Sequence, residues 1–199
     1  MSAPSWKILA ILPLAALLAA CGSQSSTSEV PAPASQSPAI EYGDPADFAV
    51  TSADIGPDGV FDDSIIGSGL AWCDGPGESV ALEWTAPPEG TESLAVVMNN
   101  TTREFNYWIQ YDIEPTERGV EHGLARKLSG INGTNSVAVR YPIAPCPEVG
   151  ETHDIVVTVY ALDTTFAGEN LHLESFKEAA QRHILAEASV TGTLSGPVE

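Results

Sequence analysis

His153 is the residue of this chain best placed to present a reactive side chain to a ligand. It follows a loop that contains Pro145, Pro147 and Gly150, and it precedes the β-branched stretch 155–160. Because proline fixes its backbone φ angle, the loop should be rigid, and a rigid scaffold can hold an imidazole toward a ligand. A structural histidine that caps the loop by a hydrogen bond is the alternative, and the residue types alone leave both interpretations open.

The other histidines and serines do not have the spacing of a metal or catalytic site. His122, His172 and His183 show no metal-ligand spacing among themselves. Glu169 and His172 form a single E-x-x-H pair, whereas a di-iron site requires two. Ser68 lies between two glycines but lacks the G-x-S-x-G elbow and a base near it in sequence. We therefore predict a non-enzymatic protein without metal or cofactor, with a weak hydrolase as an alternative.

Four aspartates near residue 58 suggest a calcium loop at first sight. Asp54, Asp58, Asp62 and Asp63 nevertheless lack the alternating order and the closing glutamate of an EF-hand loop. We favour a solvated acidic loop with a turn at its centre.

The N-terminal residues have the pattern of an export signal. Lys7 is followed by an apolar run of 13 residues, 8–20, which is shorter than the roughly 20 residues of a membrane-spanning helix. We predict a signal peptide over residues 1–20. Residues 18–21, Leu-Ala-Ala-Cys, resemble the lipobox of bacterial lipoproteins, which implies a lipid such as palmitate on Cys21. The expected location is extracytoplasmic, with a lipid anchor in the bacterial cell membrane.

A polar segment separates this signal from the predicted domain. Residues 22–40 hold six Ser, three Pro and three Ala without an apolar period, which is the composition of a flexible tether. We assign residues 21–45 to the lipidated cysteine and its tether, and residues 46–199 to one folded domain.

The charge of the chain excludes one class of partner. Eight basic and 27 acidic residues give a net charge of −19, and removal of residues 1–20 takes away Lys7 and no acid. Such a surface repels nucleic acid and anionic lipid headgroups, so no nucleic-acid partner is expected.

Cys73 and Cys146 remain once Cys21 carries lipid. An even pair of cysteines in an exported domain is most simply a disulfide, which would clamp the proline loop to the segment around residue 72. A zinc site is the competing interpretation, although the chain offers no C-x-x-C or paired histidine spacing.

The hydrophobic pattern predicts many strands and one late helix. Residues 93–98 should form a strand that residues 99–102 end, and residues 105–113 a strand with its odd-numbered apolar residues on one face. Residues 155–163 should form a central strand covered on both faces. The other expected elements are strands 48–51, 79–84, 136–141 and 188–194, a surface connection 114–135 and a helix 174–186 with His183 on its inner edge. This order predicts an antiparallel β-sandwich with one C-terminal helix.

Three stretches resemble the phosphatidylethanolamine-binding protein family, and within it the bacterial Raf-kinase-inhibitor-like branch. Residues 144–163 are similar to the family's G-P-C-P-P-x-G-x-x-H-R-Y loop and its strand ending V-Y-A-L-D. Residues 82–93 are similar to L-x-W-x-x-x-P-x-G-T-x-S, and residues 183–193 to the family's helix-to-strand ending. Cys73 stands where exported bacterial members often carry a cysteine. The resemblance covers about residues 46–195 and implies the family's sandwich fold.

The resemblance also implies where a ligand pocket would lie. Asn100 and Thr102 stand where the family has the two acids of its D-P-D-x-P turn, and Tyr107 stands at the position of a pocket histidine. His153 is retained, and Pro145 and Gly150 belong to the loop at the pocket. Two further tyrosines of the family pattern correspond to Ile155 and Pro142 in this chain. Tyr141 lies one position before the second of them.

These replacements imply an altered anion pocket. A neutral amide at Asn100 cannot act as the family's carboxylate does, so phosphate-like headgroups should bind weakly if they bind at all. The resemblance therefore implies a non-enzymatic protein that binds a small anionic ligand or an envelope protein. The alternative is an inhibitor or protein-interaction module with no small ligand, contacting its partner through residues 114–135.

Overall fold

The computed structural model describes residues 39–70 and 73–198. The predicted signal peptide, Cys21 and most of the predicted tether lie outside this part of the chain. None of the helices within it is long and apolar enough to cross a membrane.

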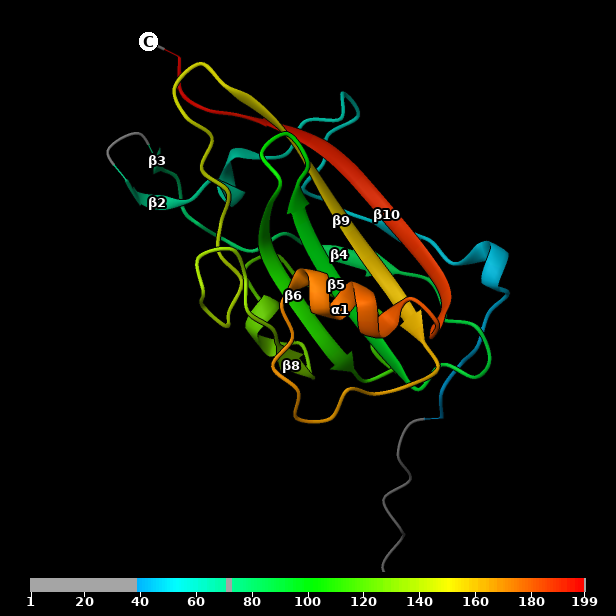
Figure 1. The fold of residues 1–199 in the computed structure, drawn as a ribbon. Coiled ribbons are helices and arrows are strands. Elements are labelled where there is room, and N and C mark those ends of the chain that lie inside the picture. The colour runs from blue at the N-terminus through cyan, green and yellow to red at the C-terminus, as the bar shows by residue number, and fades with distance from the viewer. Residues whose placement is uncertain (1–38, 71–72, 199) are drawn as a thin grey trace, which may run out of the picture. The chain divides into compact units, whose positions relative to one another are not determined.

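A five-stranded antiparallel sheet forms the main layer of the domain (Figure 1). Its order is β10-β9-β5-β6-β8. The strands are β5 (Ser93–Asn100), β6 (Phe105–Ile113), β8 (Ile131–Asn132), β9 (Thr152–Leu162) and β10 (Ile184–Ser195).

A second antiparallel sheet of three short strands packs on one face of the first. Its order is β1-β4-β7, and two further strands, β2 and β3, form a separate pair. The bounds are β1 (Val50–Thr51), β2 (Ser68–Leu70), β3 (Cys73–Asp74), β4 (Leu82–Trp84) and β7 (Gly119–Val120). Short 3-10 helices span Pro45–Asp47, Asp63–Ile65 and Ala125–Lys127. The predicted β-sandwich with one C-terminal helix is confirmed.

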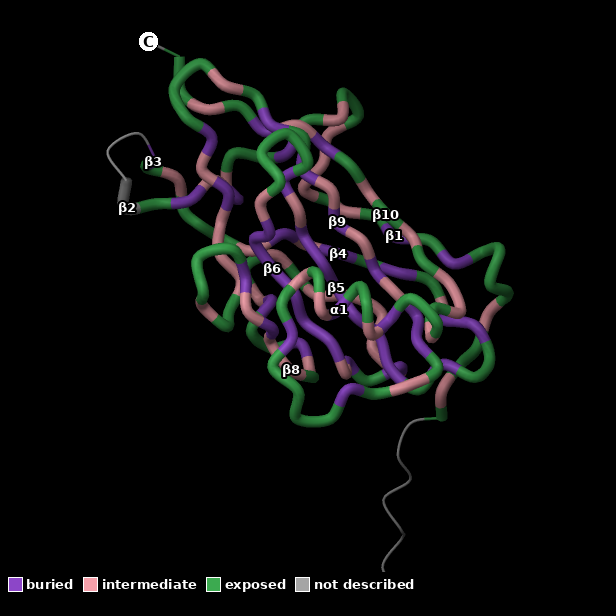
Figure 2. The backbone as a smooth tube through the Cα atoms, in the orientation of Figure 1, coloured by how far each residue is buried: buried purple, intermediate pink, exposed green. Residues whose placement is uncertain are grey.

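Strand β5 lies at the centre of the main sheet and is buried on both faces (Figure 2). Leu94, Val96 and Met98 join the core between the two sheets, whereas Ala95 and Val97 face the core beneath helix α1 (Leu173–Ala180). The prediction of a central, doubly covered strand at residues 155–163 is therefore wrong in position. Strand β9 lies next to the centre, and its outer face is only half-buried.

Helix α1 covers the outer face of the main sheet through buried aromatic contacts (Figure 1). Phe176 packs edge-on against Tyr160 and Phe166, with ring centroids 5.6 and 5.9 Å apart. The helix is shorter than predicted. It ends at Ala180, because the chain then turns and Ile184 begins the long ladder that pairs β10 with β9.

Tertiary contacts changed three other predicted elements. Strand β5 continues through Asn100, because neighbouring strands pair with it on both sides. Residues 136–141 form no strand, since the Asn135 side chain accepts hydrogen bonds from the backbone N–H groups of Val137 and Val139 and curls the chain. The predicted connection 114–135 contains β7, β8 and a 3-10 helix, and it contributes to both sheets.

Candidate functional site

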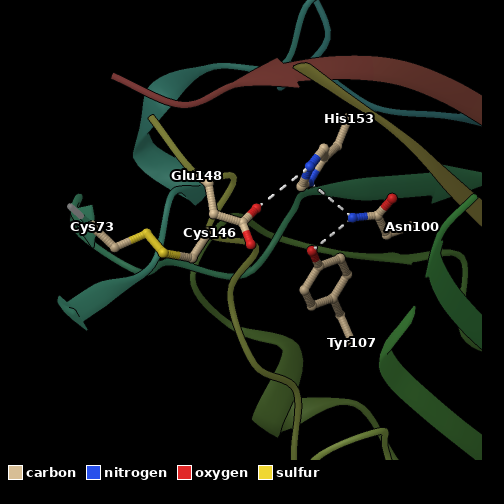
Figure 3. Close-up of a disulfide and its surroundings, with 6 residues drawn as sticks. All are labelled: Cys73, Asn100, Tyr107, Cys146, Glu148 and His153. Carbon is tan, nitrogen blue, oxygen red and sulfur yellow. Dashed lines mark hydrogen bonds and ion pairs between the residues drawn. A yellow bond between two sulfur atoms is a disulfide. The ribbon is translucent and has the colours of Figure 1, made fainter. Parts of the chain in front are cut away.

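Three buried polar side chains meet at one end of the main sheet. Asn100 ends β5, Tyr107 lies near the start of β6, and His153 near the start of β9. Since neighbouring strands are antiparallel, the end of β5 lies beside the starts of β6 and β9, and these three positions share one end of the sheet. The three residues are 1%, 6% and 3% exposed, and their side chains converge (Figure 3). The structure therefore brings together three of the residues that the sequence selected.

A β-bulge directs Tyr107 to this position. In the pairing of β5 with β6, Met98 faces Trp108 and Asn99 faces Asn106, so Tyr107 is an extra residue without a partner. An extra residue reverses the alternation of side chains. Tyr107 and Trp108 therefore both face the core between the two sheets, while Ile109 faces the core beneath helix α1. The prediction that the odd-numbered apolar residues of this strand share one face is wrong for this reason.

The hydrogen bonds of Asn100 fix the orientation of its amide. Its Oδ1 accepts from the backbone N–H of Arg103 at 3.0 Å, so Nδ2 must be the group that faces Tyr107 and His153. The Nδ2 lies 3.1 Å from the Tyr107 hydroxyl oxygen and 2.9 Å from Nδ1 of His153. Both contacts are donations from the amide, because Nδ2 has two protons and no lone pair to offer.

This geometry selects one tautomer of His153. A nitrogen that accepts from Asn100 has no proton, so the neutral ring has its proton on Nε2. The Nε2–H then donates to the Glu151 carboxylate at 2.8 Å. The imidazole thus has its only lone pair turned inward to Asn100 and its N–H turned outward.

The Tyr107 hydroxyl has an unused proton. Its oxygen accepts from Asn100, and no acceptor for its proton is found among the described residues. Burial raises the pKa of Tyr107, and the Glu148 carboxylate raises it further, so the phenol stays protonated. The ring lines the cleft at this end of the sheet. A buried O–H donor therefore faces a space that a ligand could enter.

Two carboxylates and one guanidinium form the outer part of the site. Arg103 donates to both carboxylate oxygens of Glu151 and lies 3.6 Å from Glu148. The Arg103 hydrogen bond, followed by the one from His153, lowers the pKa of Glu151 to about 2. The hydrogen bond to Glu151, with the charges of Glu151 and Glu148, raises the pKa of Arg103. Arg103 and Glu151 are therefore charged at neutral pH, and two carboxylates beside one guanidinium give the cluster a negative formal charge.

Most of these residues border a cleft of about 470 Å³. The size lies within the usual range of small-molecule sites. Its polar lining comes from Asn100, Arg103, Tyr107, Glu148 and His153, and its other lining residues are Phe105, Val137, Ile143, Ala144 and Cys146. Glu151 instead lines an adjoining hollow that shares Arg103 and His153 with the cleft.

A disulfide holds one wall of the cleft in place. Cys73 and Cys146 are bonded, with Cα atoms 5.8 Å apart, as predicted (Figure 3). Cys146 lines the cleft, and Glu148 follows two residues later in the same loop. The cross-link thus connects the carboxylate wall to strand β3.

Three residues predicted at the pocket do not line this cleft. Thr102 accepts from the backbone N–H of Asp154 at 2.9 Å and so stabilises the turn after β5. Pro145 borders a separate cavity of about 30 Å³, beside Met98 and Trp108. Gly150 has a φ of 74° and donates to the Pro197 carbonyl, so it shapes the loop.

Glu148, Glu151 and His153 have ligand atoms within 4.8 Å of one another, which is compatible with a metal site. The hydrogen bonds oppose that use. A metal needs the Nε2 lone pair, but Asn100 keeps the Nε2 of His153 protonated. The guanidinium of Arg103 also lies between the two carboxylates. The cluster fits a hydrogen-bonding organic cation better than a metal ion.

The remaining histidines each have a local acidic partner. His122 lies 2.9 Å from Asp54 and also contacts Glu78. His183 pairs with Asp163 beyond the end of helix α1, so it does not line the inner edge of that helix as predicted. His172 lies 3.3 Å from Glu174, and its ring accepts from the backbone N–H of Ser175 and so caps helix α1.

The aspartates of the acidic loop also have structural roles. Asp58 accepts from the N–H of Val60, and Asp62 accepts from the N–H of Ser64. Asp54 accepts from the N–H of Ala81 as well as contacting His122.

Sequence reasoning missed Arg103, Glu148 and Glu151. Glu148 replaces the third proline in the loop pattern that the sequence resembles, and this replacement was the only signal for it. Arg103 lies 45 and 48 residues before its partners, so no spacing rule connects them. The turn after β5 and the disulfide-linked loop bring them together.

Comparisons with known proteins agree with the fold. The family model described as phosphatidylethanolamine-binding protein matches residues 51–195, and no curated protein gives a significant match. A putative phosphatidylethanolamine-binding protein homologue from Chlamydia trachomatis has a similar structure, with a TM-score of 0.64 and 24% identity over 73% of this chain and 95% of that one. Escherichia coli YbcL, described as a new member of the mammalian family, has a TM-score of 0.66 and 24% sequence identity, over 75% of this chain and 99% of that one. The chain belongs to the phosphatidylethanolamine-binding protein family.

Proposed function

We propose that this chain is a non-enzymatic binding protein of the bacterial envelope. Lipid on Cys21 holds it at the cell membrane, outside the cytoplasm, and the cleft at the end of the main sheet binds a small ligand. The observation that carries the ligand-binding part is the buried Tyr107 hydroxyl, whose proton has no acceptor in the described chain. A buried donor left unpaired costs free energy that a ligand acceptor would recover.

The residues of the cleft favour weak binding of phosphate-like anions. Asn100 takes the position at which the family has an acid, and it donates to His153 rather than accepting from it. Glu148 and Glu151 place two negative charges beside a single guanidinium at the outer part of the site. An anion would therefore meet repulsion as well as the donors of Arg103 and Tyr107.

The tautomer of His153 supports a binding role rather than catalysis. A general base must offer a lone pair to the proton that it removes. The only lone pair of this imidazole accepts from Asn100 inside the protein. Broad esterase and phosphatase assays test this part of the proposal, and activity that disappears in a His153→Ala variant would overturn it.

Two features support the location. The Cys73 to Cys146 disulfide is typical of an oxidising compartment. The Leu-Ala-Ala-Cys sequence ending at Cys21 supports lipidation. Metabolic labelling with a palmitate analogue should mark the wild-type chain in the membrane fraction and leave a Cys21→Ser variant unlabelled; equal labelling of both would exclude the anchor.

Ligand binding can be tested by two-dimensional NMR with neutral, cationic and anionic probes. We expect at least one class to shift the backbone signals of Asn100, Tyr107 and His153, and we expect Tyr107→Phe to weaken that binding. Probes of every class that leave these signals unchanged would refute the binding cleft. Binding that survives both Tyr107→Phe and His153→Ala would place the ligand elsewhere.

A protein-interaction role is a second candidate. Val137, Tyr141 and Val149 are 51%, 45% and 44% exposed on the segment that borders the cleft. Exposed apolar side chains near a cleft can contact a partner. Binding of an envelope protein that is lost in a Val137→Asp, Val149→Asp double variant, with no small-molecule binding in the cleft, would favour this candidate.

A further inference from the structure

We propose that the cleft receives a guanidinium or primary ammonium group on an aliphatic stem, in the place now occupied by the Arg103 side chain. This inference rests on the proposed function, since it names the chemical class of the ligand for the same cleft. Arg103 is then an intramolecular occupant that the ligand displaces.

The charges of the cluster point to a cation. Glu148 and Glu151 contribute two negative charges, and Arg103 contributes one positive charge. His153 adds none in the tautomer that Asn100 selects. Within the described residues, no lysine and no other arginine forms an ion pair with either carboxylate. The carboxylates outnumber the guanidinium, so the cluster attracts a cation and repels an anion.

Arg103 itself shows the geometry that such a ligand would use. Its Nη2 donates to both carboxylate oxygens of Glu151, so a single N–H-bearing group is enough to occupy this position, and a primary ammonium could do the same. Its contact with Glu148 is long, at 3.6 Å, and both side chains are about half exposed, at 49% and 53%. Solvent-exposed ion pairs of this kind contribute little to stability, so exchange with a ligand cation requires no unfolding of the cleft.

The walls of the cleft suit the rest of the ligand. Phe105, Val137 and Ile143 provide an apolar lining against which methylene groups can pack. The rings of Phe105 and Tyr107 lie 4.9 Å apart and offer aromatic surface to a cation. The buried Tyr107 O–H points independently to a ligand, because it still needs an acceptor such as a neutral carbonyl oxygen.

A matched pair of probes tests the charge directly. Nα-acetyl-L-argininamide has a guanidinium, an aliphatic stem and neutral carbonyl groups. Nα-acetyl-L-citrullinamide has nearly the same shape without the charge. In NMR titrations of the folded domain we expect the arginine probe to shift the signals of Asn100, Tyr107 and His153, and to bind at least about tenfold tighter than the citrulline probe.

We expect two variants to change the affinity for the arginine probe in opposite directions. Glu148→Gln removes one of the two carboxylates of the proposed receptor, and we expect it to weaken binding of the arginine probe about tenfold. Arg103→Gln removes the internal competitor, and we expect it to strengthen binding of this probe by a similar factor. Glu178→Gln removes the same charge from helix α1 and serves as the control, with no change expected.

The outcomes separate this inference from the proposed function. The inference would be overturned if the two probes bind with equal affinity, or if the Arg103→Gln variant binds the arginine probe more weakly than the wild type does. If inorganic phosphate or only neutral probes shift the cleft signals, the binding cleft stands and its assignment to cations falls. If no probe of any charge shifts them in the wild type or in Arg103→Gln, both proposals fall.

Discussion

The amide nitrogen of Asn100 lies 2.9 Å from Nδ1 of His153, and both residues are almost completely buried. The amide donates and the imidazole accepts, because the Arg103 backbone N–H fixes the amide orientation. An aspartate at this position would impose the reverse direction. One side chain thus decides which nitrogen of His153 carries the proton and which faces the ligand cleft.

Asn100→Asp should move the proton of His153 from Nε2 to Nδ1. The new carboxylate accepts and cannot donate, so Nδ1 must carry a proton to bond with it. Imidazole ¹⁵N shifts at neutral pH report the tautomer directly, with the other three histidines as internal controls. A protonated Nδ1 in the wild type would contradict the assigned hydrogen-bond direction, and an Nδ1 that stays unprotonated in the variant would contradict the predicted switch.

Removal of the disulfide should destabilise the whole domain. Cys73 and Cys146 are 73 residues apart in sequence, and the chain-entropy model assigns about 4 kcal/mol to a loop of this length. We expect a Cys73→Ser, Cys146→Ser variant to lose about that much unfolding free energy in urea titrations. Dithiothreitol should destabilise the wild type and leave the double variant unaffected. A loss below about 1 kcal/mol would show that the cross-link does not restrict the unfolded chain as the model assumes.

His122 should make stability depend on pH. Its hydrogen bond with Asp54 raises the pKa of this histidine above its usual 6.5, with smaller contributions from the charge of Asp54 and from Glu78. A raised pKa in the folded state stabilises the protein fully below the unfolded value, and this contribution disappears as the pH rises through the folded pKa. The difference in unfolding free energy between the wild type and His122→Gln should therefore be largest near pH 5 and shrink toward pH 9. A difference that grows with pH would show the opposite sign of linkage.

Phe176 should be the main anchor of helix α1. It is 1% exposed and packs against Tyr111, Tyr160 and Phe166. Truncation of a buried phenylalanine leaves a cavity and costs about 3–5 kcal/mol, so Phe176→Ala should lower the unfolding free energy by that amount. Glu178→Gln on the exposed side of the helix should change it by less than about 0.5 kcal/mol. Equal effects of the two substitutions would show that the helix contributes little to the core.

The long strands could be predicted from sequence because their signal is local. Residues 105–113 form β6 with the predicted bounds, and the β-branched run after His153 forms most of β9. The paired cysteines and the proline loop also carry their own information, since an exported domain with two remaining cysteines has few ways to use them. These features, with the resemblance of three stretches, were sufficient for the fold and for Asn100, Tyr107 and His153.

Other features depend on contacts between distant residues. The bulge that directs Tyr107 into the cleft arises from the pairing of β5 with β6, and the end of helix α1 is set by the pairing of β10 with β9. The strand predicted at residues 136–141 is replaced by a turn that the Asn135 side chain organises. No pattern of single residues contains this pairing information.

The sequence determined the sandwich and the cysteine pair through its hydrophobic pattern and cysteine count, and it determined the polar residues at the end of the sheet through its resemblance to the family's motifs. Only the tertiary structure decided that Arg103, Glu148 and Glu151 meet beside His153, and that the imidazole has its N–H turned outward. The physical reason is that charge and hydrogen-bond direction at a site are set by partners about 50 residues apart, which the chain brings together only when its strands pair and its loop is cross-linked.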